Sequence, residues 1–187
     1  MKRIALATVV AAFSLVAVPS ALAAKPLTFD EQNGTGNPLV TSIVSGDFTF
    51  TSAHEHIIGE PGICGFGGCV SNGTTTIAEE AGGVGQPITM AVTGGGEFKL
   101  KWVDAAPLFL DSGAASIGGV PNATQVYVVG TTSGGGTVSA TLVLNGNPEF
   151  QSFKLPSDFK KLVSVTFYGN NASNTGGFQL DNIKAND

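Results

Sequence analysis

The sequence of 187 residues is poor in charged side chains, and arginine is almost absent. Charged residues make up 12% of the chain, about half the usual share in globular proteins. Arg3 is the single arginine, and the formal net charge is −5. Arginine supplies the planar fork that grips phosphate groups, and an acidic protein repels a polyanion. The composition therefore excludes nucleic-acid binding.

The sequence also lacks the motifs of common hydrolases. No Gly-x-Ser-x-Gly elbow occurs, and both histidines, His54 and His56, stand together, so no serine nucleophile has its usual partners. Glu79 and Glu80 are adjacent, and on a strand they point to opposite sides, unlike the facing carboxylates of a glycosidase. We therefore predict a protein that is not an enzyme.

The first residues predict export. Lys2 and Arg3 precede an almost wholly apolar run from Ile4 to Val18, and an Ala-x-Ala site ends at Ala23. This is the pattern of a Sec signal peptide, because the apolar run is shorter than the roughly 20 residues of a membrane span. We expect a signal peptide of residues 1–23 and a single mature domain of residues 24–187 without a membrane span. That domain would be extracellular or periplasmic.

Beyond the signal, short alternating segments separated by glycine-rich turns predict strands. In residues 97–103, the side chains of Phe98, Leu100 and Trp102 share one face, which we expect to be the core face. Residues 105–110 are compatible with a short strand or with one helical turn. No segment has a convincing amphipathic helical pattern. We therefore predict an all-β fold, a two-sheet antiparallel β-sandwich of jelly-roll type, with strands near residues 27–31, 46–53, 87–93, 97–103, 124–131, 136–145, 150–155, 162–168 and 177–184.

Three acidic residues stand near the two ends of the expected domain. Asp30 and Glu31 lie in the first expected strand, residues 27–31, and Asp181 lies in the last. A jelly roll that closes by pairing these strands would gather the three carboxylates, whose hard oxygens suit Ca²⁺. The chain has no dense Asp-x-Asp-x-Asp loop, so three separately solvated acids are the alternative.

Both cysteines lie in a long loop, at Cys64 and Cys69. An even number of cysteines in an exported chain indicates a disulfide. A zinc site formed with His54 and His56 is the alternative, since two cysteines and two histidines fit tetrahedral coordination. We favour the disulfide.

The same region holds the densest group of unusual side chains. His54 and His56 share one side of a strand, and Phe66 lies in the adjacent loop. Long loops inside compact domains are often functional. We predict a ligand or partner surface at His54, His56 and Phe66, with an ordinary polar strand edge as the alternative for the histidines.

Several motifs, in their order along the chain, resemble those of exported bacterial β-sandwich proteins that often carry a PEP-CTERM sorting domain. They are Thr49-Phe50-Thr51 with His54 and His56, Gly68-Cys69 through Asn72-Gly73-Thr74, Ile88-Thr89-Met90 with Gly95 to Phe98, Gly136 to Ser139 with Phe150 to Pro156, and Phe178 to Ile183. The chain shows no Pro-Glu-Pro motif or apolar sorting tail after the last strand. The resemblance therefore implies a member that is released or loosely held.

More broadly, the chain resembles jelly-roll carbohydrate-binding modules. That resemblance implies a structural Ca²⁺ between an early acid, Glu31 or Asp30, and Asp181 in the final strand. Our leading hypothesis is an exported, non-enzymatic binding module for carbohydrate or another cell-surface polymer. The alternative is a structural or adhesive protein of the envelope or extracellular matrix without a small ligand.

Overall fold

A computed structural model describes residues 25–32, 39–59, 70–79, 87–110, 121–170 and 176–186. The predicted signal peptide and Cys64, Phe66 and Cys69 lie outside these ranges. No helix in the described ranges is long and apolar enough to cross a membrane. The described elements are a 3-10 turn η1 (Asp30–Gln32) and the strands β1 (Leu39–Ser45), β2 (Phe48–Gly59), β3 (Thr76–Glu79), β4 (Ile88–Val92), β5 (Lys99–Pro107), β6 (Gln125–Thr132), β7 (Thr137–Val143), β8 (Gln151–Lys154), β9 (Leu162–Gly169) and β10 (Phe178–Asn186).

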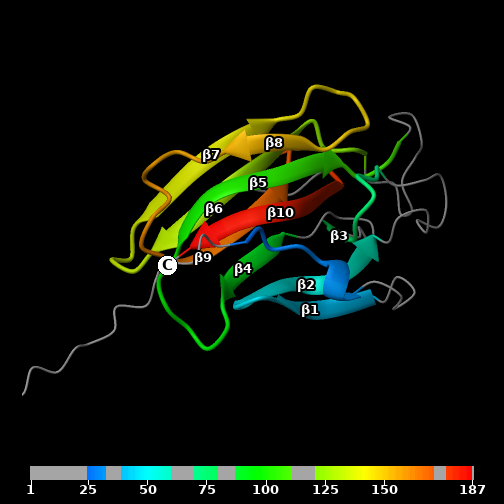
Figure 1. Cartoon of the computed structure of the whole chain (residues 1–187). Coiled ribbons are helices and arrows are strands. Elements are labelled where there is room, and N and C mark those ends of the chain that lie inside the picture. The colour runs from blue at the N-terminus through cyan, green and yellow to red at the C-terminus, as the bar shows by residue number, and fades with distance from the viewer. Residues whose placement is uncertain are drawn as a thin grey trace, which may run out of the picture.

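The strands form two antiparallel layers, as the sequence predicts. The front sheet consists of β8, β5, β10 and β3, and the back sheet consists of β7, β6, β9 and β4 (Figure 1). The long strand β2 belongs to both layers, because residues 48–51 pair with β4 and residues 56–59 pair with β3. Strand β1 pairs with β2. Hydrogen bonding therefore continues from one sheet into the other.

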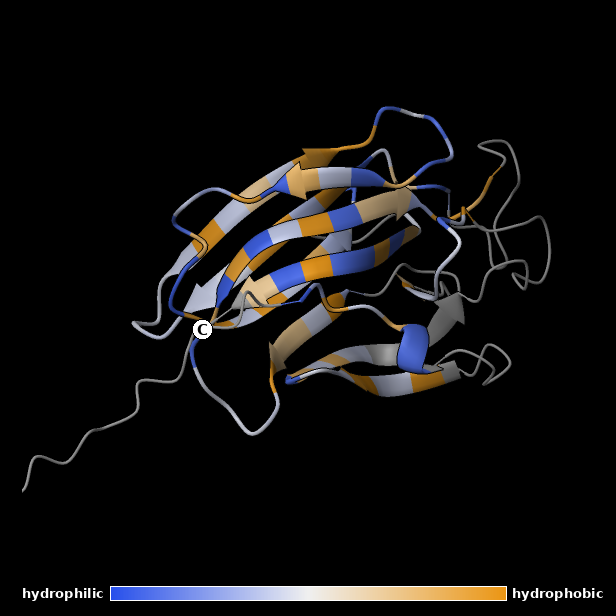
Figure 2. Ribbon diagram, in the orientation of Figure 1, coloured by the Kyte–Doolittle hydropathy of each residue, from blue (hydrophilic) through white to orange (hydrophobic). Residues whose placement is uncertain are grey.

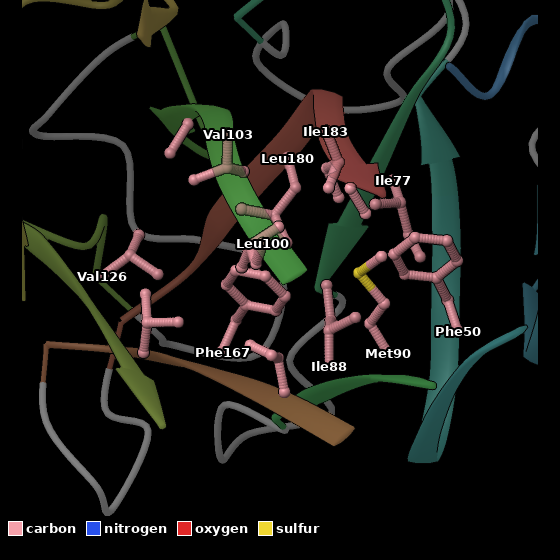
Figure 3. Close-up of a cluster of buried hydrophobic side chains, with 14 of the residues drawn as sticks. Phe50, Ile77, Ile88, Met90, Leu100, Val103, Val126, Phe167, Leu180 and Ile183 are labelled. Carbon is pink, nitrogen blue, oxygen red and sulfur yellow. The ribbon is translucent and has the colours of Figure 1, made fainter. Parts of the chain in front are cut away.

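The space between the sheets is filled by the apolar side chains of alternate strand positions. Phe50, Met90 and Phe167 of the back layer face Leu100 and Leu180 of the front layer (Figure 3). All five side chains are fully buried. Burying a side chain of this size stabilises the folded state by roughly 1.5–3 kcal/mol. The burial of these side chains between the layers therefore holds the two sheets together.

The predicted pairing of the two chain ends is confirmed, although the first segment forms a bridge in place of a full strand. The Leu27 amide donates to the Ile183 carbonyl at 2.7 Å, and the Ile183 amide donates to the Leu27 carbonyl at 3.0 Å. The 3-10 turn follows at once. Strands β1 and β3, which were not predicted, are also present, and residues 105–107 prolong β5.

Candidate functional site on the outer face of the front sheet

Trp102 lies on the outside of the molecule, so the prediction that it belongs to the core is wrong. Along β5, Leu100 is fully buried, whereas Trp102 is 40% exposed. The cause is a register shift: Leu100 lies opposite Ala185, but Trp102 lies opposite Lys184. Two steps along β5 therefore match one step along β10, and Lys101 is the extra residue of a β-bulge. A bulge reverses the side to which later residues point.

Two lysines flank Trp102 across the sheet. Lys154 on β8 and Lys184 on β10 are its direct cross-strand partners, and directly opposite residues project from the same side of a sheet. The ammonium nitrogen of Lys154 lies 5.9 Å from the centroid of the Trp102 ring, within the range of a cation–π contact. The ring is thus exposed beside two positive charges.

Beside Trp102 and its two lysine partners, three polar side chains lie on the same face: Asp104, Ser152 and Asn182. Asp104 accepts a hydrogen bond from the Ser152 hydroxyl at 2.5 Å and another from the Asn182 amide at 3.0 Å. The two bonds go to different carboxylate oxygens, so the orientation of Asp104 is fixed. Figure 2 shows the alternation of polar and apolar residues along β5 and β10 that produces this face. We call Trp102, Lys154, Lys184, Asp104, Ser152 and Asn182 the tryptophan face.

The neighbouring part of the same sheet is covered by residues 70–75. Gln179 on β10 is fully buried, and its amide nitrogen donates to the carbonyls of Val70 at 3.0 Å and Leu108 at 2.9 Å. Its side-chain oxygen accepts a hydrogen bond from the Thr76 hydroxyl at 2.8 Å. A buried amide must satisfy its donors and acceptor, and here it does so by anchoring the covering segment.

Asp181 lies under this covering segment and is fully buried. One carboxylate oxygen, Oδ2, accepts hydrogen bonds from the Asn72 amide at 2.7 Å and the Thr74 hydroxyl at 2.8 Å. Burial raises the pKa of Asp181 above its ordinary value, the bonds from Asn72 and Thr74 lower it, and the charge of Asp30 raises it. Asp30 and Asp181 are therefore close enough to interact, as the sequence predicts.

Two oxygens at this place have no hydrogen-bond partner among the described residues. They are the second carboxylate oxygen of Asp181, Oδ1, and the hydroxyl of Thr75. Asp30 contributes a third oxygen, because its Oδ1 accepts the Thr75 amide at 3.0 Å. Unsatisfied buried oxygens of this kind are what a calcium ion coordinates. The oxygens of Asp30, Asp181 and Thr75 are of the type that Ca²⁺ prefers, although the described part of the chain contains no group of three or more acidic, histidine or cysteine side chains placed to hold a metal ion.

Glu31, the third acid of the predicted cluster, lines a hollow of about 660 Å³. Lys25, Asp47 and Glu97 line the same hollow, with Phe48 and Phe98 among its apolar side chains. The structure therefore places Glu31 beside other charged groups and Asp30 beside Asp181.

The predicted ligand residues are only partly described. His54 and His56 lie in β2, but their side chains, like Phe66 and the predicted disulfide of Cys64 and Cys69, lie outside the described residues. That ligand surface stays a prediction. Sequence reasoning did not find Lys154, Lys184 or Asp104, because their nearness to Trp102 depends on strand order and on the bulge.

The outer face of the back sheet has a different chemistry. One row of directly paired residues crosses six strands without a charged side chain, and five of its six members carry hydroxyls. The hydroxyls of Thr89 and Thr166 are 3.0 Å apart. We call this set the hydroxyl row: Ser42, Thr51, Thr89, Thr166, Val129 and Ser139.

No protein-family model and no curated protein matches the sequence. Among solved structures, two variants of a family 29 carbohydrate-binding module are similar at 15% identity over 74% of this chain and 91% of theirs, with TM-scores of 0.39 and 0.38. The enzymatically active domain of bacteriophage CBA120 tailspike protein 4 is also similar, at 13% identity and a TM-score of 0.35. That match covers 84% of this chain and 20% of the tailspike chain. These scores are below 0.5, so the function is inferred from this chain's own residues.

Proposed function

We propose that this protein is a non-enzymatic binding module for carbohydrate or another cell-surface polymer. The observation that carries the proposal is the exposed ring of Trp102 on the outer face of the front sheet. An indole ring presents a large apolar surface on which the C–H face of a sugar ring packs. Asp104, Ser152 and Asn182 lie on the same face, and groups of this kind accept from and donate to hydroxyls.

The test is retention of the purified protein on a panel of insoluble polysaccharides and peptidoglycan. We expect retention on at least one polymer and loss of retention in Trp102→Ala, by roughly 30-fold in affinity if the ring is a hot spot. Tyr168→Ala is the matched control, because Tyr168 packs against Tyr127 on the back sheet. Equal losses in both variants, or retention that survives Trp102→Ala, would contradict the proposed site.

The predicted surface at His54, His56 and Phe66 is tested in the same assay. Replacement of all three by alanine changes no residue of the tryptophan face. Loss of retention in this variant alone, with normal retention of Trp102→Ala, would assign binding to the histidine region.

The hydroxyl row favours the second candidate function, a structural or adhesive envelope or matrix protein. An uncharged sheet face lacks the charge repulsion that keeps two copies of an acidic protein apart. Such a protein would self-associate through this face. Sedimentation at increasing protein concentration distinguishes the two functions, because the binding module stays at its starting size in the absence of polymer.

We further propose that Asp30 and Asp181 hold a structural Ca²⁺ ion, with the Thr75 hydroxyl beside them. The unpartnered oxygens of Asp181 and Thr75 support this proposal. A calcium concentration a hundredfold above Kd would stabilise the fold by about 2.7 kcal/mol. A melting temperature that is unchanged by a chelator, in protein purified with calcium, would remove it.

We also propose export through cleavage of residues 1–23, so that the protein acts outside the cytoplasm. Intact-mass analysis of the protein from its host tests this: the mature chain would begin at Ala24.

A further inference from the structure

Positive charge is concentrated around the tryptophan face, although the whole chain has a formal net charge of −5. Lys99 and Lys101 lie on β5, Lys154 on β8 and Lys184 on β10. The loop after β8 lies against β5, because the Leu155 amide donates to the Lys101 carbonyl at 2.9 Å and the Leu100 amide donates to the Phe159 carbonyl at 3.1 Å. This contact brings Lys160 to the same end of the sheet, whereas Lys161 lies at the turn between β6 and β7, because its carbonyl accepts the Ser133 amide at 2.8 Å.

The acidic residues in this region are fewer. Glu97 precedes β5, Asp158 lies in the loop after β8, and Asp104 lies on the face itself. Asp181 lies directly opposite Asp104, under the covering segment. Five lysines, of which Lys154 and Lys184 flank Trp102, therefore stand against four carboxylates in this part of an acidic protein, and one of the four is buried. Local charge of one sign raises the concentration of ligands of the other sign at a surface.

The two lysines nearest Trp102 define where a negative group would be placed. Neighbouring strands are about 4.8 Å apart, so the backbones of Lys154 and Lys184 are separated by about 10 Å across Trp102. A ring stacked on the indole lies between them. Substituents on either edge of that ring come within reach of a lysine ammonium group, since lysine side chains are long and flexible.

The contact between Lys154 and the indole ring favours a charged ligand over a neutral one. The ammonium nitrogen lies over the ring at 5.9 Å, so a sugar that stacks there displaces it. A neutral sugar offers no replacement for the lost cation–π contact, whereas an acidic sugar offers an ion pair. The carboxylate of Asp104 accepts hydrogen bonds from Ser152 and Asn182.

We infer that the tryptophan face binds an anionic glycan, a polymer of sugar rings that carry carboxylate or sulfate groups. The indole ring of Trp102 stacks on a sugar ring, and Lys154 and Lys184 pair with its negative groups. This inference rests on the proposed function and names the ligand class for the same site.

The experiment compares each anionic polymer with a neutral form of the same backbone, by native gel electrophoresis of the full chain in gels that contain the polymer. Polygalacturonate and its methyl ester form one such pair, and chondroitin sulfate and desulfated chondroitin methyl ester form a second. We expect about tenfold tighter binding to the charged member of at least one pair. We expect this advantage to shrink as salt is raised, because screening weakens exposed ion pairs.

Lysine variants locate the effect. Lys154→Gln and Lys184→Gln should each weaken binding to the charged polymer about threefold. Binding to a neutral polymer should be unchanged or, for Lys154→Gln, slightly tighter. Lys25→Gln is the control, since Lys25 lines the hollow near Glu31 and changes the net charge by the same amount.

The outcomes separate this inference from the proposed function. Equal, salt-independent binding to both members of each pair, still lost in Trp102→Ala, would overturn the anionic ligand and leave the binding module standing. No binding to any charged or neutral polymer would overturn both. Equal weakening by Lys25→Gln would show a general charge effect and would also overturn the specific role of Lys154 and Lys184.

Discussion

The outer face of the front sheet presents Trp102 between Lys154 and Lys184, whereas the outer face of the back sheet presents the uncharged hydroxyl row. Both faces are made by the same alternation of residues along strands. They differ because the bulges in β5 and β10 change the side to which Trp102 itself points, whereas the register shifts of β1 with β2 and of β6 with β9 leave Thr89, Thr166 and Val129 in regular pairing. The comparison teaches that the functional candidates collect where the regular alternation is interrupted, as bulges often do at sites.

Residues 70–75 cover part of the front face and bury the polar side chain of Gln179 there. Within the described residues, the hydroxyl row on the back face is not covered in this way. Gln179→Ala should therefore give the largest effect on stability, a loss of about 3 kcal/mol, because the carbonyls of Val70 and Leu108 and the Thr76 hydroxyl lose a buried partner. Chemical denaturation measures it. Gln125→Ala on the back sheet is the control, and a loss in Gln179→Ala no larger than in that control would contradict the anchoring role.

The variant Asp181→Asn tests how the charge of the buried Asp181 carboxylate affects stability. Burial raises the pKa of Asp181 in the folded state. Without metal, its contribution to stability is therefore fully present below the unfolded pKa of about 3.9 and is lost as pH rises through the folded pKa. With a chelator present at pH 7, we expect the melting temperature of Asp181→Asn to equal or exceed that of the parent protein. Near pH 3.5 the difference between the two melting temperatures should be smaller, because Asp181 is then protonated in the parent.

Calcium should reverse this order at pH 7. The parent protein gains stability when Ca²⁺ is added, whereas Asp181→Asn does not, because an amide lacks the charge that balances the ion. Asp158→Asn, a change at an exposed acid, is the control and should still respond to calcium. A calcium response in Asp181→Asn equal to that of the parent would place any ion elsewhere.

The smallest change in stability is expected for a substitution on the back face. Thr89→Val removes one member of the hydroxyl pair with Thr166 and keeps the shape of the side chain. At a partly exposed position this should change the free energy of unfolding by no more than about 0.5 kcal/mol and leave polymer binding unchanged. A loss of polymer binding here would make the back face the binding surface.

Much of the fold follows from the sequence, because strands with clear alternation, such as β6, β7 and β9, need only the period of two to be recognised. The pairing of the two chain ends was also predicted, and it places Asp30 near Asp181. Strand β1 was missed because Val-Thr-Ser-Ile-Val-Ser follows a loop rich in glycine and asparagine without a sharp boundary. The short strand β3 lies between segments that give no strand signal.

The candidate site was harder to predict for a physical reason. Alternation alone puts Trp102 on the same side as Leu100, and only the extra residue at Lys101 turns it outward. The bulge is visible in the pairing of β5 with β10, which a single sequence does not contain. Lys154 and Lys184 come from strands distant in sequence, so no local motif joins them to Trp102.

The central claim is that ligand binds against Trp102, and the protein itself contains the probe, because Trp102 is its one tryptophan. The most direct measurement is the tryptophan emission of the full chain during titration with a polymer that retains it. We predict a saturable blue shift with reduced quenching by acrylamide, because a stacked sugar removes water from the half-exposed ring. A polymer that binds tightly while the emission and quenching of Trp102 stay unchanged would contradict the account.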